Sequence, residues 1–328
     1  MKHVLDFIKR IPEDLEESRV IALLIDGLGT LGLNLPGFSV ETYETVFPSS
    51  TPTFMYTFHS MLTPPEHGFL EWYMRFGNTV VAIPPWVDVL RARKLELGED
   101  VSEEDVFPFK PLPEVLADKG FSVTYYTPFT DSAFTKAVTK GAEVREIKYL
   151  SQVFPLSDAD ATFIYWPSID SILHERYVDE ALQAEVEFME LFIKQLARKI
   201  PRKTTLYVLA DHGLTLCKHR HELPTIGPEP PVGGERVTFY KGVNVEEVRE
   251  ELSARGIPAK ALKTEEAPHF KGKLSPRCVN NYGDVIVIAD EHTCFKYPFE
   301  EGLKKGLGAH GGLSREEISV NIWKYSKS

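Results

Sequence analysis

The chain has 328 residues, of which 43% are hydrophobic and 26% charged, and this ordinary globular composition suits one large α/β domain or two smaller ones. The formal net charge of −11 weighs against binding of long nucleic acids, because no basic tract is present to neutralise a phosphate backbone. Apolar runs such as Val20–Ile25 are far too short to cross a bilayer, which argues against a membrane protein.

The N-terminal residues and the cysteines both favour a cytoplasmic protein. Met1–Asp14 mixes apolar and charged residues and has no small-residue cleavage site, so we expect no signal peptide. The three cysteines, Cys217, Cys278 and Cys294, form no Cys-x-x-Cys pair and leave at least one unpaired. That pattern fits a reduced compartment better than a disulfide framework.

Strand and helix patterns alternate along the chain. Val20–Asp26 is a continuous apolar run that ends in an acid, as expected of a buried central strand. Further predicted strands are Ser122–Tyr126, Ala161–Tyr165, Thr205–Ala210 and Val285–Ala289. An amphipathic helix is predicted before the fourth strand from apolar residues spaced by four and three: Leu182, Val186, Met189, Ile193, Leu196 and Ile200. This order predicts an α/β layer fold with a largely parallel sheet.

No repeat and no obvious linker divides the chain, so we expect a single catalytic domain over residues 1–328. Two stretches, roughly 68–111 and 217–283, are richer in proline and less periodic than the rest. We interpret them as excursions that form a lid or a substrate wall.

Acidic and histidine side chains follow several of the predicted strands. Asp26 comes directly after the first strand, Asp170 shortly after the third, and Asp211 and His212 directly after the fourth. Functional groups of α/β sheets gather beyond the carboxyl ends of the strands, so this coincidence indicates a site there.

The segment Phe47-Pro-Ser-Ser-Thr-Pro-Thr53 is expected to open a helix, with Thr51 as N-cap and Pro52 as the first helical residue. A helix N-terminus can hold a phosphate group. Taken alone, Thr51 is more simply a structural cap, because a threonine hydroxyl is a poor nucleophile unless a metal or a base activates it.

Ligands for such a metal are present. Asp170 and His174 are four residues apart, on one face if the segment is helical, and His310 lies in the flexible sequence Gly-Ala-His-Gly-Gly. Each alone could be a cap, a surface pair or an exposed loop residue. Together with Asp26, Asp211 and His212 they form mixed nitrogen and oxygen ligand sets of the kind that suits Zn²⁺ or Mn²⁺.

Other polar and aromatic side chains are weaker candidates for substrate binding. His59 falls within the helix after Thr51 and could reach substrate or simply pack. Four aromatic residues could line a pocket, although core packing is the more common role for them: Tyr73, Phe76, Trp86 and Trp166.

These motifs resemble those of the type I phosphodiesterase/nucleotide pyrophosphatase family of the alkaline phosphatase superfamily. The resemblance runs from the Leu-Ile-Asp-Gly sequence at Asp26 to His310, through FPSST and SMLTPPEHGFLEW, YWPSIDSILH, ADHG and GAHGG. It implies a three-layer α/β/α sandwich and two zinc-like ions. By motif position, one ion would be held by Asp170, His174 and His310, and the other by Asp26, Asp211 and His212, with Thr51 as nucleophile and additional ligand.

The chain departs from that family at two places. Eukaryotic members carry Asn three residues after the nucleophile, where this chain has Phe54, and a Thr-Gly pair later in the helix is replaced by Ser60-Met61. Both changes leave the ligand set intact but affect substrate preference. Another group must then complete the contacts to the phosphoryl oxygens, with the Thr51 backbone N–H and His59 as candidates.

The resemblance implies hydrolysis of a small, nucleotide-like phosphodiester or pyrophosphate by two-step in-line displacement through a covalent phospho-threonine. A phosphomonoesterase with the same metals is the nearest alternative. A phosphomutase of the same superfamily commonly carries a large insert domain, for which we see no room. A non-catalytic metal-binding protein is disfavoured, because structural zinc sites usually have four protein ligands and these sets provide three each.

Overall fold

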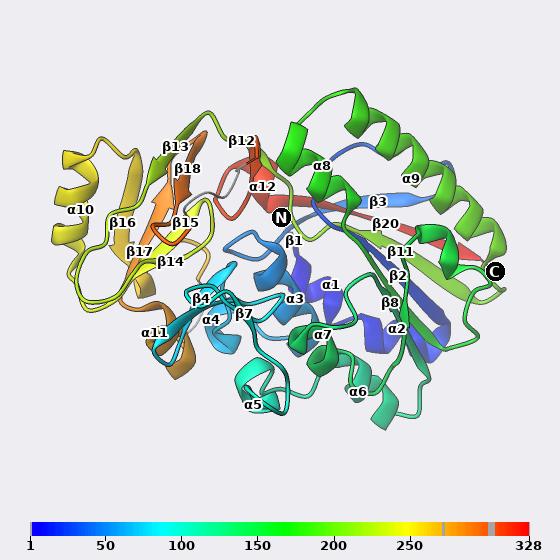
Figure 1. Ribbon diagram of the computed structural model, residues 1–328. Coiled ribbons are helices and arrows are strands. Elements are labelled where there is room, and N and C mark those ends of the chain that lie inside the picture. The colour runs from blue at the N-terminus through cyan, green and yellow to red at the C-terminus, as the bar shows by residue number, and fades with distance from the viewer. Residues whose placement is uncertain (1, 271–272, 301–305, 328) are drawn as a thin grey trace.

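The computed structural model describes residues 2–270, 273–300 and 306–327 (Figure 1). Its centre is a sheet of eight strands in the order β1-β3-β20-β11-β2-β10-β8-β9. In chain order these strands are β1 (Lys2–His3), β2 (Arg19–Ile25), β3 (Ser39–Glu44), β8 (Val123–Thr127), β9 (Glu143–Glu146), β10 (Ala161–Trp166), β11 (Thr204–Leu209) and β20 (Ser319–Lys327).

The sheet is mostly parallel, as predicted. β11, β2, β10, β8 and β9 are parallel to one another, whereas β20 is antiparallel to both β11 and β3. Val20 pairs with Ala161 on one side and Thr205 on the other, so the three central strands end at the same edge. That register brings together the residues that follow β2, β10 and β11.

Helices cover both faces of this sheet, which confirms the predicted three-layer arrangement (Figure 1). α8 (Ser168–Arg176) and α9 (Glu180–Lys199) lie on one face. The other face carries α1 (Val4–Ile8), α2 (Ile11–Glu17), α3 (Thr51–Ser60), α6 (Leu112–Asp118) and α7 (Ala133–Val138). α9 starts at Asp179, whose side chain accepts hydrogen bonds from two backbone N–H groups, and its predicted apolar stripe packs on the core through Met189, Ile193 and Leu196.

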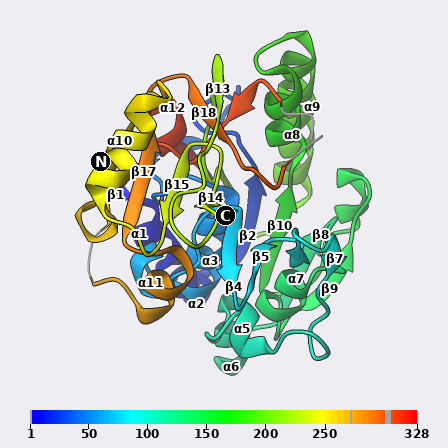
Figure 2. The ribbon, with the colours of Figure 1, turned by 60° about the vertical axis from the view of Figure 1, so that its left-hand side comes forward.

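The predicted strand Val285–Ala289 exists but belongs to a different sheet. It is β17, the third strand of an antiparallel sheet in the order β14-β15-β17-β16, with α10 (Val245–Ala254) beside it (Figure 2). The other strands are β14 (Val232–Gly233), β15 (Val237–Tyr240) and β16 (Ala259–Lys263). An apolar run alone does not distinguish a central parallel strand from a strand buried in a second sheet.

The stretch 68–111 carries its own small antiparallel sheet of four strands: β4 (Tyr73–Phe76), β5 (Thr79–Ala82), β6 (Val87–Asp88) and β7 (Arg93–Lys94). The short helices α4 (Pro64–His67) and α5 (Glu103–Val106) flank it in the chain. The second stretch, 217–283, supplies α11 (Pro276–Tyr282), which packs on β4. The two stretches expected as excursions are therefore in contact with each other.

Two short strand pairs connect the second stretch to the C-terminal part of the chain. β12 (Thr215–Leu216) pairs with β19 (Gly308–Ala309), and β13 (His219–Glu222) pairs with β18 (Thr293–Lys296). The remaining elements are α12 (Arg315–Ile318) and two single turns of 3₁₀ helix, Leu150–Val153 and Thr264–Glu266.

The β13–β18 pairing brings Cys217 and Cys294 together as a disulfide, while Cys278 is buried and free. One cysteine is unpaired, as expected, but the sequence did not indicate the disulfide, because partners 77 residues apart in the chain become neighbours only through this strand pairing. The cysteine pattern therefore no longer supports a reduced compartment. Within the described part of the chain, none of the helices combines the length and apolar character needed to cross a membrane.

Candidate metal centre and active site

Three acidic groups meet where the central strands end. Asp26 directly follows β2, Asp211 follows β11 by two positions, and Asp170 lies in the first turn of α8 after β10. Gly27 is required between them: its backbone has a φ of +72°, its N–H donates to Asp211 Oδ1 at 3.0 Å, and a β-carbon there would lie 2.8 Å from the Asp170 Cα. Only glycine fits such a close approach, which explains the Asp-Gly sequence at the end of β2.

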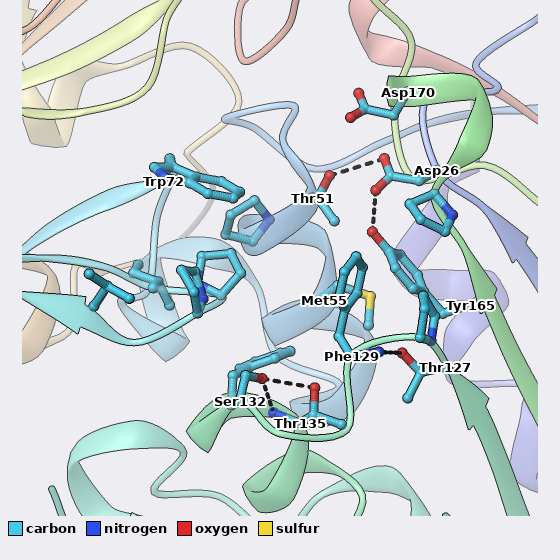
Figure 3. A pocket seen from close by; sticks show the side chains of 18 of the residues that line it. Asp26, Thr51, Met55, Trp72, Thr127, Phe129, Ser132, Thr135, Tyr165 and Asp170 are labelled. Atoms are coloured by element: carbon cyan, nitrogen blue, oxygen red, sulfur yellow. Dashed lines mark hydrogen bonds between the residues drawn. The ribbon is translucent and has the colours of Figure 1, made fainter. Parts of the chain in front are cut away.

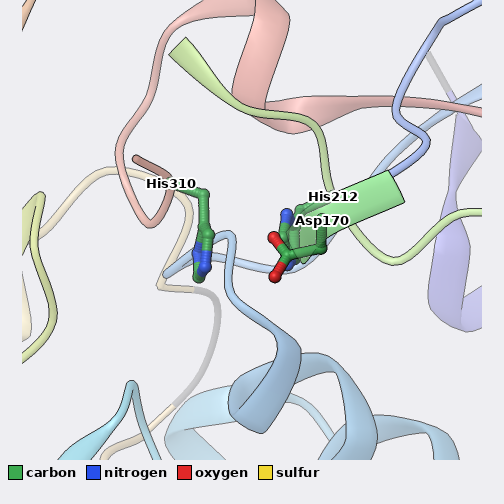
Figure 4. A group of neighbouring side chains, drawn as sticks. All are labelled: Asp170, His212 and His310. Carbon is green, nitrogen blue, oxygen red and sulfur yellow. The ribbon is translucent and has the colours of Figure 1, made fainter. Parts of the chain in front are cut away.

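Two groups of potential ligand atoms share His212. Atoms of Asp26, Asp211 and His212 all lie within 4.8 Å of one another, and so do atoms of Asp170, His212 and His310 (Figure 4). His212 Nε2 is 3.4 Å from both Asp26 Oδ1 and Asp211 Oδ2. The imidazole rings of His212 and His310 are stacked with centroids 4.0 Å apart.

His174 lies beside the second group without being part of it. Its Nε2 is 3.3 Å from Asp170 Oδ1 and its ring centroid is 5.1 Å from that of His310. Its Nδ1 lies 3.0 Å from the Gly308 carbonyl oxygen, and donation to that oxygen leaves Nε2 available to an ion. The motif-based pairing of Asp170 with His174 on one helical face therefore matches the geometry, while His212 lies closer to that group than expected.

The electrostatics of the centre suit divalent cations. Burial raises the pKa of Asp26 well above its usual value, and the neighbouring carboxylates of Asp211 and Asp170 raise it further. Burial and His212 hold the pKa of His310 well below its usual value, so His310 is a neutral imidazole, the form that binds metals. Asp170 Oδ1 and Asp211 Oδ2 are buried without hydrogen-bond partners. Cations would compensate these crowded acids, so the residues present fit a metal centre.

Thr51 is placed directly against this centre. Its Oγ1 is 3.1 Å from Asp26 Oδ1 and 2.9 Å from His212 Nε2. α3 begins at Thr51 with Ser50 as the N-cap residue, one position earlier than the sequence suggested, because Pro52 is accommodated at the second helical position as well as at the first. The hydroxyl thus lies where the free N–H groups of the helix start face the ligand groups.

A cavity of about 920 Å³ opens over these residues (Figure 3). Its lining includes Asp26, Thr51, Asp170, His174 and His310. The remaining wall is mostly apolar and comes from α3, the 68–111 stretch, the end of β8 and the end of β10, including Met55, Tyr56, Trp72, Tyr73, Ile83, Pro84, Pro85, Phe129, Phe134 and Tyr165. The volume lies within the range typical of small-molecule sites.

Two residues discussed from the sequence lie away from this cavity. His59 is completely buried against Tyr125 and Phe58, and burial lowers its pKa to about 3. It is eight residues after Thr51, roughly 12 Å along the helix axis. The suggested contact between His59 and substrate therefore finds no support in the geometry. Phe54 is also buried and stacks on Phe58, so it offers the cavity nothing in place of the family Asn.

Two polar residues next to the centre were not predicted from the sequence. The Tyr165 hydroxyl donates a short hydrogen bond to Asp26 Oδ2. Glu71 is 1% exposed, lines the cavity and packs against the glycine that follows His310. The register of β10 against β2 would have revealed Tyr165, because Tyr165 pairs with Leu24, two residues before Asp26. Glu71 carries no comparable local signal.

Of the four aromatic residues considered, Tyr73 lines the cavity and Trp86 is fully buried.

Comparison with known structures supports the fold. Murine ectonucleotide pyrophosphatase/phosphodiesterase 5 superimposes with a TM-score of 0.68 at 17% identity over 94% of this chain and 88% of that chain. An inactive form of the same murine protein in complex with AMP gives a TM-score of 0.67 at 17% identity, with the same coverage. Phosphonoacetate hydrolase from Sinorhizobium meliloti 1021, in complex with phosphonoacetate, gives a TM-score of 0.63 at 15% identity over 95% of this chain and 91% of that chain.

No curated protein sequence matches the chain. The sequence profile of the type I phosphodiesterase/nucleotide pyrophosphatase family, in contrast, matches residues 21–313, from the first residues of β2 past the His310 loop. This span contains every ligand candidate and Thr51. The chain is therefore a hydrolase that belongs to the type I phosphodiesterase/nucleotide pyrophosphatase family.

Proposed function

We propose that the protein hydrolyses phosphodiester or pyrophosphate bonds of small, nucleotide-like substrates, with two divalent ions and a covalent phospho-threonine intermediate. The observation that carries this proposal is the position of the Thr51 hydroxyl, within 3.1 Å of both Asp26 and His212 at the start of α3. A purely structural residue would have no need of two buried acids, a third acid nearby and two histidines around it.

The motif order and the geometry suggest how the ligands are divided. Asp26, Asp211 and His212 would hold the ion next to Thr51, and Asp170, His174 and His310 the other, with His212 close to both. Zinc suits this mixed donor set, with manganese as the alternative. When bound, such ions lower the pKa of a hydroxyl and neutralise charge on the phosphoryl oxygens.

Thr51 supplies the nucleophile in the first step. Its Oγ forms a bond to phosphorus while the bond to the leaving-group oxygen breaks, and the hydroxyl proton passes to solvent. In the second step a water oxygen attacks phosphorus, the bond to Thr51 Oγ breaks, and Oγ regains a proton. Backbone N–H groups at the start of α3 face the phosphoryl group and favour its negative charge.

The cavity favours a substrate larger than a simple phosphonate. A phosphonate group with a carboxymethyl substituent would leave most of the 920 Å³ empty, whereas a nucleotide-sized molecule would fill more of it. The murine relative seen with AMP is consistent with the nucleotide-like alternative.

The proposal is tested by comparing the zinc-loaded protein on bis-p-nitrophenyl phosphate and on p-nitrophenyl phosphate. Preference for the diester supports it, and preference for the monoester favours a phosphatase with the same centre. Thr51→Ala should abolish turnover while zinc binding is largely retained, whereas Thr42→Ala, the same change on the exposed face of β3, should leave the rate unchanged. A Thr51→Ala protein with near wild-type rates would exclude the covalent route.

A further inference from the structure

Glu71 has an unusual backbone conformation for its residue type. It lies in the loop between α4 and β4 with a φ of +60°, in the left-handed region, and its side chain is 1% exposed. A left-handed conformation is strained for a residue other than glycine and persists only where the surroundings enforce it. Strain combined with burial beside a catalytic cavity calls for a functional explanation.

One side of Glu71 is tied to the start of α3. Its backbone N–H donates to Thr53 Oγ1 at 3.0 Å, and Thr53 Oγ1 lies 2.9 Å from Ser50 Oγ. The Ser50 side chain also interacts with the Glu71 carboxyl group and acts to lower its pKa. Glu71 is thus linked to the residues on both sides of Thr51.

The other side of Glu71 packs on two glycines, one next to the predicted ligand His310 and one next to Glu235. A β-carbon at Gly311, one residue after His310, would overlap Glu71 Oε1, and a β-carbon at Gly234 would overlap Oε2. Glu235, which follows Gly234, has an Oε2 atom 3.8 Å from His174 Nδ1. Both positions are glycine because the carboxyl group occupies the space that a side chain would need.

The same two segments are also joined without Glu71. The Ser49 N–H donates to the Gly311 carbonyl oxygen at 3.3 Å, and Ser49 Oγ donates to the Gly312 carbonyl oxygen at 2.8 Å. These contacts hold the entry to α3 near the His310 loop. The carboxyl group of Glu71 fills the gap behind them and sets how closely the two segments approach.

The Glu71 carboxyl group lacks the charged partner that Glu317, the other buried acid at the His310 loop, has. Glu317 is paired with Arg236 and accepts from the Gly312 N–H at 2.7 Å. Glu71 has no cationic partner among the described residues and its Oε1 has no hydrogen-bond partner. Burial raises the pKa of Glu71 well above its usual value, with Glu317 and Glu235 raising it further and the Ser50 side chain acting to lower it. An uncharged glutamine can therefore take its place.

We propose that Glu71 is a positioning residue that holds the N-terminal turn of α3 and the His310 loop at a fixed separation, so that Thr51 and His310 act on the same phosphoryl group. This inference rests on the proposed function only for the roles of Thr51 and His310. The packing of the carboxyl group between Ser50, Gly234 and Gly311 is independent of it.

The test compares Glu71→Ala and Glu71→Gln, with Asp88→Ala as the control. Asp88 is also a buried acid, 2% exposed, but it does not line the cavity and is paired with Arg91 and the Thr79 hydroxyl. Zinc affinity is measured with a competing chelator, and kcat and KM on the diester. Melting temperature and circular dichroism establish that each variant is folded.

We expect Glu71→Ala to weaken zinc binding about tenfold and to lower kcat at saturating zinc about thirtyfold, with KM within threefold of wild type. Glu71→Gln should restore both values to within threefold, and Asp88→Ala should change neither, even if its melting temperature falls as far. Zinc affinity and kcat that are unchanged in Glu71→Ala, or equally reduced in Asp88→Ala, overturn the proposal. Zinc affinity needs no substrate, so this outcome stands even if the wild-type protein hydrolyses none of the diesters and the proposed function fails.

Gly234→Ala supplies a second, independent measurement on the same contact. Its new methyl group collides with the Glu71 carboxyl group, so we expect it to weaken zinc binding on its own. In the Glu71→Ala background that collision is gone, and the same change should cost less than twofold. Equal effects of Gly234→Ala in both backgrounds would mean that the carboxyl group does not set this separation, and the inference would be wrong.

Discussion

The strand-end edge and the cavity wall are built in opposite ways. The edge takes its candidate ligands from the ends of β2 and β11, from α8 and from the His310 loop, and its acids are crowded, with Asp26 and Asp211 buried. The wall is apolar, and its exposed aromatic residues, Trp72 and Phe129, come from loops outside the central sheet (Figure 3). The sheet therefore fixes the chemistry, while the surrounding loops are free to set which molecule reaches it.

The same substitution made at the edge and on the cavity wall tests most directly whether the chemistry belongs to the edge alone. Asp211→Asn keeps the shape of a buried ligand candidate but removes its charge, so we expect kcat/KM to fall about a thousandfold. Asp131→Asn, on the cavity wall, should change it less than threefold. Steady-state kinetics at saturating zinc measure both. Similar losses in the two variants would mean that the wall takes part in the chemistry.

The disulfide between Cys217 and Cys294 is expected to stabilise the part of the fold next to the His310 loop. Cys217 follows β12, which pairs with the strand before His310, and Cys294 lies in β18. Closing a loop of this length is expected to stabilise the fold by about 2–4 kcal/mol, so Cys217→Ser should lower the melting temperature by several degrees. Cys278→Ser is the control at the free cysteine.

Thiol titration under denaturing conditions checks the pairing itself. The unreduced protein should release one reactive thiol, from Cys278, and the reduced protein three. Three thiols before reduction would show that Cys217 and Cys294 are not joined in the isolated protein. The segment after β12 and the strand β18 would then be held together by strand pairing alone.

The residues of the edge could be predicted from the sequence better than those of the cavity wall. Asp26 and Asp211 could be placed together because the apolar runs before them predict parallel strands that end at one edge. Asp170 and His174 needed only helical spacing. No local pattern marks Glu71 or Phe129, whose positions depend on how loops pack after the sheet has formed. The disulfide and the second sheet were missed for the same reason: both arise from pairings between distant segments.

Proton competition provides a smaller, graded test of the edge. In the ion-free protein, burial acts to lower the pKa of His174, but the Asp170 carboxylate outweighs it and raises the pKa to about 9. Below that pH an incoming ion must displace a proton, and above it there is none to displace. We therefore expect zinc affinity to rise about tenfold per pH unit between about 7 and 9 and then to level off.

Chelator-competition titrations at several pH values measure this dependence. His174→Gln should bind zinc more weakly and show a flatter profile over the same range, because the titrating group is gone. His219→Gln, on the strand β13, serves as the control. An unchanged slope in His174→Gln would place the released proton on another ligand, and His174 would not be part of the site.

Substitutions in the cavity wall should change substrate binding, measured as KM, rather than the chemical step, measured as kcat. Trp72 and Phe129 are 42% and 52% exposed and line the cavity near Thr51, so a substrate can bury both rings without moving them far. Removing either ring should cost about 1 kcal/mol or somewhat more of binding, which raises KM several-fold to about tenfold with kcat within threefold. Phe188→Ala, at an equally exposed position on α9, should leave KM unchanged. If Trp72→Ala instead lowered kcat at constant KM, the ring would contribute only in the transition state, and the separation between a chemical edge and a binding wall would no longer hold.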